Sequence, residues 1–498
     1  MDILAAFTMT ALDLLSGLFV FIIGFGILIL IYMYFVDANQ SRDAIRHNYP
    51  VIGRFRNLFL RLGEFFRQYF FALDREEMPF NRAQRDWIYK SAKGGDNTAP
   101  FGSTLSLSPV GTPIFVNCAF PTLKKDAEEP PAVVFGPNTE HPYSASSIIN
   151  ISGMSYGALS RPAIRALSRG AKRAKCWLNT GEGGLSAYHL EGGCDIVFQI
   201  GTAKYGVRNE KGEFCEQRLA EIAGRENVKM IELKLSQGAK PGKGGLLPGA
   251  KVTREIAAIR GIPVGKDSIS PNRHLEADTC EQLLDFIDRI RTIARKPVGV
   301  KTALGAYGWL EDLCDEINRR GPDSAPDYIA IDGGEGGTGA APMPLMDNVG
   351  LSIREALPTA IDIITAKGLR DRIKILCAGK MVTPADVAWA YCAGADVVMS
   401  ARGFMFAIGC IQAMRCNTNN CPTGITTHKK RLQEGLDPLS KAENVSNFVE
   451  KMRYGVGLIA HSCGVKHPRA LRRHHVRIMQ EDGRSAPLDK LYPPAGPF

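Results

Sequence analysis

Eight short apolar segments alternate with helical patterns and glycine-rich loops between residues 147 and 400. They are SIINIS (147–152), CWLN (176–179), IVFQI (196–200), MIELKL (230–235), PVGVK (297–301), YIAID (328–332), IKILC (373–377) and DVVMS (396–400). Strands that alternate with helices pair in parallel, and these units in order predict an α/β fold, a (β/α)8 TIM barrel. An open doubly wound sheet is the alternative. Barrel active sites lie at the C-terminal ends of the strands, so we expect functional residues in the loops that follow these segments.

Residues 14–36 form an uncharged stretch, LLSGLFVFIIGFGILILIYMYFV. As a helix at ~1.5 Å per residue it would be ~35 Å long, enough to cross a hydrocarbon core of ~30 Å. A cleaved signal peptide is the alternative, but the stretch is too long for one and no basic residue precedes it. Several arginines follow it, whereas only Asp2 and Asp13 are charged before it. The positive-inside rule therefore predicts a single-pass protein of the inner (cytoplasmic) membrane, with its C-terminal bulk in the cytoplasm.

The next segment, residues 54–71, alternates arginines with aromatic and aliphatic residues. This spacing predicts an amphipathic helix, which either lies on the inner leaflet or packs on the barrel or on a partner subunit. The expected organisation is an anchor (1–40), an amphipathic helical linker (41–94), an irregular proline-rich segment packed on the barrel (95–147), the barrel (148–424) and a basic helical C-terminal tail (425–498).

The composition excludes some classes of protein. A net charge of +10 could indicate nucleic-acid binding, but no basic block is interleaved with aromatic residues, so we expect no nucleic-acid partner. The excess charge of the tail suits an anionic membrane surface or an acidic electron donor, or is a solvated helical surface. Twelve scattered cysteines are too few for a disulfide scaffold and favour a reducing compartment.

Three cysteines follow the last predicted strand, Cys410, Cys416 and Cys421, with the spacing C-x5-C-x4-C. Thiolates are soft ligands that suit iron–sulfur clusters, and three of them fit a three-iron cluster or a four-iron cluster with one other ligand. Three buried thiols are one alternative. A zinc site completed by His428 is another, although the usual C-x2–4-C pair is missing.

The loop after the sixth predicted strand, residues 334–339, reads GEGGTG and matches the dinucleotide pattern GxGxxG. The match is weak because Pro342 and Pro344 argue against the helix that should follow. Bare backbone amides in such a loop can still approach a flavin or a phosphate, and a flexible loop without a ligand is the alternative.

The loops after the last two predicted strands are where barrels that bind flavin mononucleotide (FMN) hold its phosphate. Here they contain Gly379 with Lys380, and Arg402 with Gly403. A guanidinium binds a phosphate in a bidentate manner. Lys301, at the end of the fifth segment, could stabilise negative charge on a reduced flavin, or it caps a strand in solvent.

Taken together, the motifs resemble the glutamate synthase family over roughly residues 95–470, and most closely its stand-alone, membrane-anchored glutamate synthase-like proteins. The matching segments are ISGMSYGALS (151–160), TGEGG (180–184), FQIG (198–201), KLSQGAKPGKGGLLPGAKV (234–252), DGGEGGTGAAP (332–342) and GCIQAMRCNTNNCPTGITT (409–427). The resemblance implies a barrel of the FMN-binding type and a [3Fe–4S] cluster on Cys410, Cys416 and Cys421. It places FMN contacts among Met154, Ser155, Gln199, Lys301, Gly336, Gly337, Thr338, Gly379, Lys380, Arg402 and Gly403.

The same resemblance implies that Lys240 and Arg260 hold the two carboxylates of 2-oxoglutarate, and that Glu182 and Lys301 act in catalysis, unless Glu182 is a structural acceptor. The implied reaction reduces 2-iminoglutarate, formed from 2-oxoglutarate and ammonia, to glutamate with electrons from a ferredoxin-like donor. Amine transfer as in N-methylglutamate synthase-like enzymes, or a non-catalytic membrane-tethered electron-transfer or scaffold subunit, are the alternatives.

The chain also departs from the family pattern. No glutaminase nucleophile is visible near Met1, so ammonia would come free or from a separate glutaminase subunit. A C-terminal β-helical domain is likewise not visible. Where the family has a proline–histidine run, this chain has Pro271-Asn272-Arg273-His274, which puts substrate contacts on that side in question.

Overall fold

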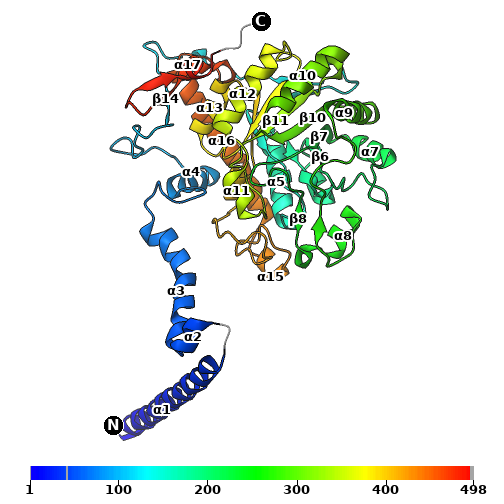
Figure 1. The fold of residues 1–498 in the computed structure, drawn as a ribbon. Coiled ribbons are helices and arrows are strands. Elements are labelled where there is room, and N and C mark those ends of the chain that lie inside the picture. Colours follow the sequence, from blue (N-terminus) through cyan, green and yellow to red (C-terminus); the bar gives the residue numbers. More distant parts are fainter. Residues whose placement is uncertain (1, 41–42, 494–498) are drawn as a thin grey trace. The chain divides into compact units, whose positions relative to one another are not determined.

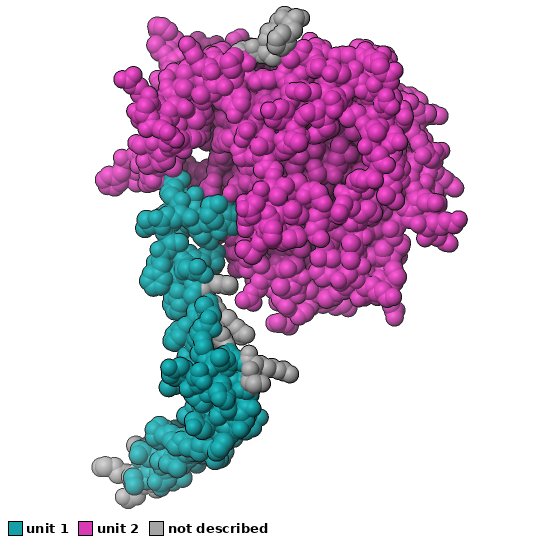
Figure 2. Space-filling model, viewed as in Figure 1, with its two compact units in different colours: residues 1–83 teal, residues 84–498 magenta. Residues whose placement is uncertain are grey.

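The computed structural model describes residues 2–40 and 43–493. The chain divides into two compact units, residues 1–83 and 84–498, which Figure 2 draws in different colours. The second unit contains all eight predicted strand segments.

The second unit is built on a closed parallel barrel, and the helices surround its strands (Figure 1). The barrel strands are β4 (Ile149–Ile151), β5 (Leu178–Asn179), β6 (Ile196–Ile200), β7 (Val228–Lys234), β10 (Val298–Ala303), β11 (Tyr328–Asp332), β12 (Lys374–Ala378) and β13 (Val397–Ser400). The barrel closes where β13 pairs in parallel with β4, with Val398 opposite Ile149. The TIM-barrel prediction is therefore confirmed, and the open-sheet alternative is wrong.

Helices follow the strands in the expected order. The longer ones are α5 (Arg161–Ala174), α7 (Glu216–Ala223), α9 (Cys280–Ala294), α10 (Gly308–Arg320), α12 (Ile353–Ala366), α13 (Pro384–Ala393) and α16 (Pro438–Ser462), and short ones are α6 (Ala187–Leu190), α8 (Arg254–Arg260), α11 (Met343–Asn348), α14 (Arg402–Ala407), α15 (Lys430–Gln433) and α17 (Leu488–Leu491). The short α11 corrects one expectation. A helix does begin after the glycine loop, because Pro344 lies in its first turn, where a missing N–H breaks no intrahelical bond.

The N-terminal end of the barrel is sealed by a hairpin of β2 (Val133–Phe135) and β3 (Tyr143–Ala145). Phe135 is fully buried, and its ring centroid lies 6.0 Å from that of Trp177 and 5.5 Å from that of Tyr328, both edge-on. Trp177 precedes β5 and Tyr328 begins β11, so this cluster lies at the end of the barrel opposite the loops that carry the predicted site. The hairpin that precedes β4 therefore packs across the floor of the barrel.

The C-terminal segment completes the barrel instead of forming a separate tail. Helix α16 packs against α5 and α13, at the position of the eighth barrel helix. The approach to α5 is close at Gly170, where an added Cβ would lie 2.9 Å from the carbonyl oxygen of Ala442. Strands β14 (Val476–Met479) and β15 (Ser485–Pro487) form an antiparallel sheet with β1 (Pro113–Phe115). The expectation of a helical tail therefore missed two strands.

Several basic side chains of this segment are used inside the molecule. The Arg469 guanidinium donates to the carbonyl oxygens of Asp396 at 3.2 Å and Ser147 at 3.0 Å. Arg473 forms an ion pair with Asp362 at 2.6 Å. Part of the positive charge that the sequence suggested for a membrane or a partner thus holds the C-terminal segment on the barrel.

The first unit consists of α1 (Asp2–Ala38), α2 (Ala44–Asn48), α3 (Ile52–Phe66) and a π-helical turn (Arg67–Phe71). By length and composition, α1 is the one helix in the described residues that could cross a membrane, with a mean hydropathy of 2.9 over its most apolar window. At its end the buried Asp37 carboxylate accepts hydrogen bonds from Arg46 and, at 2.7 Å, from Arg54. Helix α3 leaves Phe55 and Phe59 exposed, as an amphipathic helix would.

Candidate active site

The predicted site residues lie at one end of the barrel because all eight strands run in parallel. Lys301 is on β10, Glu182 is in a turn after β5 (Gly181–Gly183), and Lys240 is in the loop after β7. Lys380 follows β12, and Arg402 begins α14 directly after β13. The C-terminal ends of five strands thus supply these side chains.

Glu182 lies among three cations. Its Oε1 atom is 2.9 Å from the Nζ atom of Lys234. Burial raises the pKa of Glu182, but the positive charges of Lys234, Lys240 and Arg260 outweigh burial and hold it at about 2. The carboxylate is therefore ionised and weakly basic at neutral pH, which suits an acceptor or counter-ion better than a proton donor.

The two residues that the resemblance assigned to the substrate are both buried at this point, each 5% exposed. Burial lowers the pKa of Lys240 to about 8, against the opposing effect of Glu182. The Arg260 guanidinium donates to the Ser268 hydroxyl at 3.1 Å and lies 5.0 Å above the Tyr205 ring. Its Nε atom has no hydrogen-bond partner within the described chain.

These four side chains do not balance in charge. Three cations, Lys234, Lys240 and Arg260, surround one carboxylate, Glu182, which leaves an excess of two positive charges. Buried charges are costly unless they are paired. A ligand with two carboxylates would supply the missing counter-charge.

A second polar group lies inside the barrel. The fully buried Glu232 accepts hydrogen bonds at Oε1 from Asn179 at 2.8 Å and Gln199 at 2.6 Å, and its Oε2 atom has no partner among the described residues. The Lys301 ammonium, 6% exposed, lies 3.5 Å from the Asp332 carboxylate. Burial lowers the pKa of Lys301, but the negative charges of Asp332 and Glu232 raise it by more. The pKa of Lys301 is therefore above its usual value, and the group is a cation. A solvent-exposed cap on a strand is therefore the wrong interpretation of Lys301.

The glycine loop after β11 packs on the predicted phosphate site. A Cβ added to Gly337 would lie 2.7 Å from Nε of Arg402, whose guanidinium donates to the Glu335 carbonyl oxygen at 2.7 Å. Burial lowers the pKa of Lys380, and the neighbouring Arg402 lowers it further. Two adjacent cations beside bare glycine backbone can hold a phosphate.

The remaining predicted contacts surround this group. Met154 and Gln199 are buried, Ser155 and Thr338 are partly exposed, and Gly379 has a positive φ of 123°. The amide of Gly403 donates to the Ser400 hydroxyl at 3.3 Å, and a Cβ on Gly336 would lie 2.9 Å from the Asp332 carboxylate. No ligand contact tests these assignments, so they stay predictions.

The loop after α14 brings the three predicted cluster cysteines together. Burial raises the pKa of the Cys410 thiol to about 12, and the nearby Cys416 and Cys421 thiols add to this rise. Burial also raises the pKa of Cys421, but hydrogen bonds from Thr423 and Thr426 lower it by more. In the described part of the chain, no three Cys, His, Asp or Glu side chains stand in position to hold a metal ion.

His428, the fourth ligand of the zinc alternative, is engaged elsewhere. Its Nε2 atom donates to the carbonyl oxygen of Gly157 at 2.8 Å. Burial lowers the pKa of His428 to about 4, so the imidazole is neutral. His428 is therefore not in position to act as the fourth ligand of the zinc alternative.

Sequence reasoning missed several functional-site candidates: Asn179, Glu232, Lys234 and Asp332. Each is a polar or charged residue inside, or at the end of, an otherwise apolar strand segment. Side chains two residues apart on a strand share one face, so Glu232 and Lys234 point to the same side of β7. This spacing of two residues was the signal in the sequence that could have identified Glu232 and Lys234.

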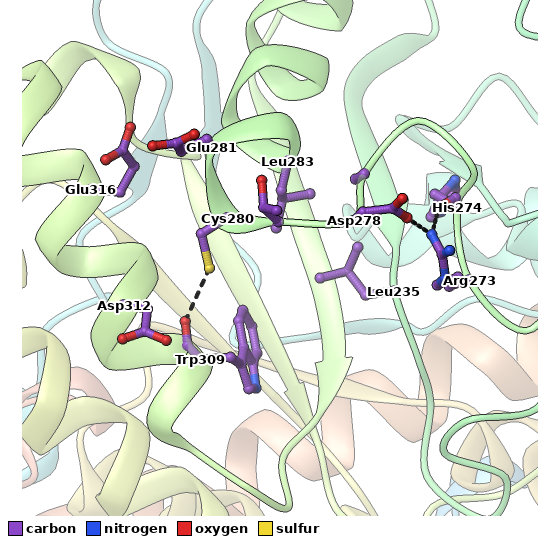
Figure 3. Close-up of a pocket in the computed structure, with 12 residues that line it drawn as sticks. Leu235, Arg273, His274, Asp278, Cys280, Glu281, Leu283, Trp309, Asp312 and Glu316 are labelled. Atoms are coloured by element: carbon purple, nitrogen blue, oxygen red, sulfur yellow. Dashed lines mark hydrogen bonds and ion pairs between the residues drawn. The ribbon is translucent and has the colours of Figure 1, made fainter.

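A cleft of about 630 Å³ lies beside the barrel mouth, between the beginnings of α9 and α10 (Figure 3). Its lining includes Cys280, Trp309 and an ion pair between Arg273 and Asp278. His274 also lines it and contacts the carbonyl oxygen of Lys234 at 2.9 Å through Nε2. Two residues of the segment that departs from the family pattern, Arg273 and His274, therefore line a cleft next to β7.

The fold and the site define the protein as a TIM barrel with a glycine-lined, cation-rich mouth. The model of the conserved region in glutamate synthase matches residues 112–466. The chain therefore belongs to the family of proteins that carry the conserved glutamate synthase region.

Two relatives illustrate the range of the family. The glutamate synthase large subunit-like protein YerD of Bacillus subtilis is 37% identical, over 96% of this chain and 98% of its own length. The archaeal glutamate synthase (NADPH) of Methanocaldococcus jannaschii is 35% identical, but the match covers 66% of this chain and 61% of that protein. Among solved structures, a mandelate oxidase variant matches with a TM-score of 0.44 at 16% identity, over 80% of this chain and 92% of its own.

The buried network around Glu232 predicts a difference between two substitutions. Glu232→Leu leaves the amide N–H groups of Asn179 and Gln199 without an acceptor, so we expect the free energy of unfolding to fall by about 2–5 kcal/mol. Glu232→Gln keeps one carbonyl oxygen as acceptor and should cost much less. Chemical denaturation of both variants measures the difference, and equal losses would show that the negative charge, not the acceptor, is what the site needs.

Proposed function

We propose that the protein is a flavin-dependent and iron–sulfur-dependent oxidoreductase that aminates 2-oxoglutarate to glutamate. The observation that supports this most is the excess of two positive charges around Glu182, which a dicarboxylate would neutralise. Membership of the glutamate synthase family supports the same reaction class. Lys240 and Arg260 would each bind one carboxylate of the substrate.

The residues at the barrel mouth fit FMN. Arg402 and Lys380 would hold its phosphate, since they are adjacent cations beside glycine backbone. Lys301 would lie at the flavin ring, because it is a buried cation on the barrel strand β10. When bound, FMN would supply hydride chemistry, and a cluster on the three cysteines would supply single electrons.

The three cysteines would supply the thiolate donors of a three-iron cluster. Three thiols lie within electrostatic reach of one another, and the backbone N–H of Gln412 donates to the sulfur of Cys410 at 3.5 Å. Such N–H groups stabilise negative sulfur. The electron donor would be ferredoxin-like, and the ammonia would come free or from a separate glutaminase subunit.

The apolar helix α1 and the arginines after it support a location at the inner membrane, with the catalytic unit in the cytoplasm. In this arrangement the amphipathic α3 would rest on the inner leaflet, with its exposed aromatic side chains in the lipid.

The proposed reaction is tested with protein purified anaerobically in detergent. Reduced protein should show flavin reoxidation only when 2-oxoglutarate and ammonia are both present. Lys240→Ala should slow this by roughly 10- to 100-fold, because it removes a charge-assisted hydrogen bond. The matched control is Lys266→Ala, an exposed lysine in a nearby loop. Reoxidation by methylamine but not by ammonia would favour amine transfer, and no reoxidation by either would favour the scaffold alternative.

The pKa of Lys240 predicts how substrate binding depends on pH. In the protein without substrate, Lys240 has a pKa of about 8, so its side chain is mainly a cation only below that pH. Affinity for 2-oxoglutarate, measured by calorimetry without ammonia, should therefore be constant below pH 8 and fall by about tenfold per unit above it. Lys240→Arg keeps its charge and should move this fall to higher pH. An unchanged profile in that variant would show that Lys240 is not the titrating group.

The glycine loop gives a matched pair for FMN. In Gly337→Ala the new methyl group meets Arg402, so we expect the affinity for FMN to fall by roughly tenfold. Gly339→Ala, two residues along the same loop, has open space around its Cβ and should keep normal affinity. The flavin content per chain, from absorbance after FMN titration, gives the answer. If both variants bound the same amount of FMN, Arg402 would not be part of the phosphate site.

A further inference from the structure

A buried lysine that the proposed mechanism does not use lies beside the three cysteines. Lys251 is 2% exposed, and its Nζ atom donates to the carbonyl oxygens of Ala158 at 2.6 Å and Cys416 at 3.3 Å. Within the described chain, no hydrogen bond or ion pair joins it to a carboxylate. The Cys416 and Cys421 thiols instead raise its pKa against the larger opposing effect of burial. Lys251 therefore lies beside the cysteine loop, in contact with the backbone of Cys416.

The same contacts tie Lys251 to the loop after β4. Three consecutive carbonyl oxygens of that loop each accept a hydrogen bond from a basic side chain: Tyr156 from Arg260 at 3.3 Å, Gly157 from His428 at 2.8 Å, and Ala158 from Lys251 at 2.6 Å. Arg260 belongs to the proposed dicarboxylate site, whereas His428 and Lys251 adjoin the cysteine loop. One short loop therefore lies between the two sites.

We infer that Lys251 is a positioning residue that raises the reduction potential of the iron–sulfur cluster and fixes the loop between the cluster and the substrate site. The inference rests on the cluster of the proposed function. A cluster held by three thiolates is anionic and becomes more negative on reduction. A buried cation beside it stabilises the reduced form more than the oxidised form, because the low-dielectric surroundings screen the charge weakly.

The role of the charge is tested in the full-length protein purified anaerobically. Iron and acid-labile sulfide are measured first, and the cluster is then titrated with redox mediators and followed by electron paramagnetic resonance. Lys251→Gln keeps hydrogen-bond donors for the two carbonyls but removes the charge. We expect it to lower the ratio of reduced to oxidised cluster at a fixed potential by about tenfold, equivalent to a shift of about 59 mV for one electron.

Two further variants separate charge from structure. Lys251→Arg keeps the charge and should keep the wild-type potential. Lys296→Gln is the matched control, because Lys296 is also buried and binds the carbonyl oxygens of Ala223 and Val228, but it lies at the opposite end of the barrel. Its potential should not change. A wild-type potential in Lys251→Gln overturns the inference.

The remaining outcomes are equally decisive. If Lys251→Gln holds no iron while Lys251→Arg holds the wild-type amount, the charge is required for the cluster, which supports the inference. If Lys251→Gln and Lys251→Arg both lose iron, the site depends on the size and shape of the lysine side chain and not on its charge, and the inference fails. Wild-type protein without iron and sulfide overturns the cluster and the inference together. Wild-type protein with a cluster but without amination of 2-oxoglutarate overturns only the proposed reaction, because the titration does not depend on turnover.

Discussion

The barrel mouth is organised by an imbalance of buried charge. Lys234, Lys240 and Arg260 converge on Glu182, which is the one carboxylate in this group of four side chains. An arrangement of this kind costs stability unless a ligand supplies the missing negative charge. The fold accepts that cost because the three cations come from a strand, a loop and a helix that the closed barrel holds in place. The unpaired positive charges thus lower the stability of the folded protein and at the same time form a preorganised anion-binding site.

Glycine makes the crowded mouth possible. The loops after β4 and β5 touch at Gly181, where an added Cβ would lie 2.6 Å from the amide nitrogen of Ser155. Gly201 faces Glu182 in the same way, with the carboxylate oxygen 2.6 Å from where a Cβ would be. Any side chain at these points would push the loops apart. At Gly181 and Gly201 glycine is therefore needed for the close approach of neighbouring groups.

Most of the barrel could be predicted because each strand is a short apolar run, and each of the eight predicted segments overlaps one observed strand of the barrel. The partner of Glu182 could not be predicted in this way. Lys234 lies within an apolar run, so the periodicity argument treated it as an interruption and not as a site residue. The floor hairpin was also missed, because its two strands are only three residues long. The β1–β14 pairing was missed because it joins segments more than three hundred residues apart in the sequence.

The late pairing of β13 with β4 has a consequence for how the chain is made. Strand β4 acquires its neighbour β13 only after residue 400 has been synthesised, and α16 and β14 come later still. During translation the unfinished barrel therefore exposes an open edge on β4, a hazard for aggregation. Helix α1 emerges long before that point. The whole of α1 is therefore synthesised before β13 can close the barrel on β4.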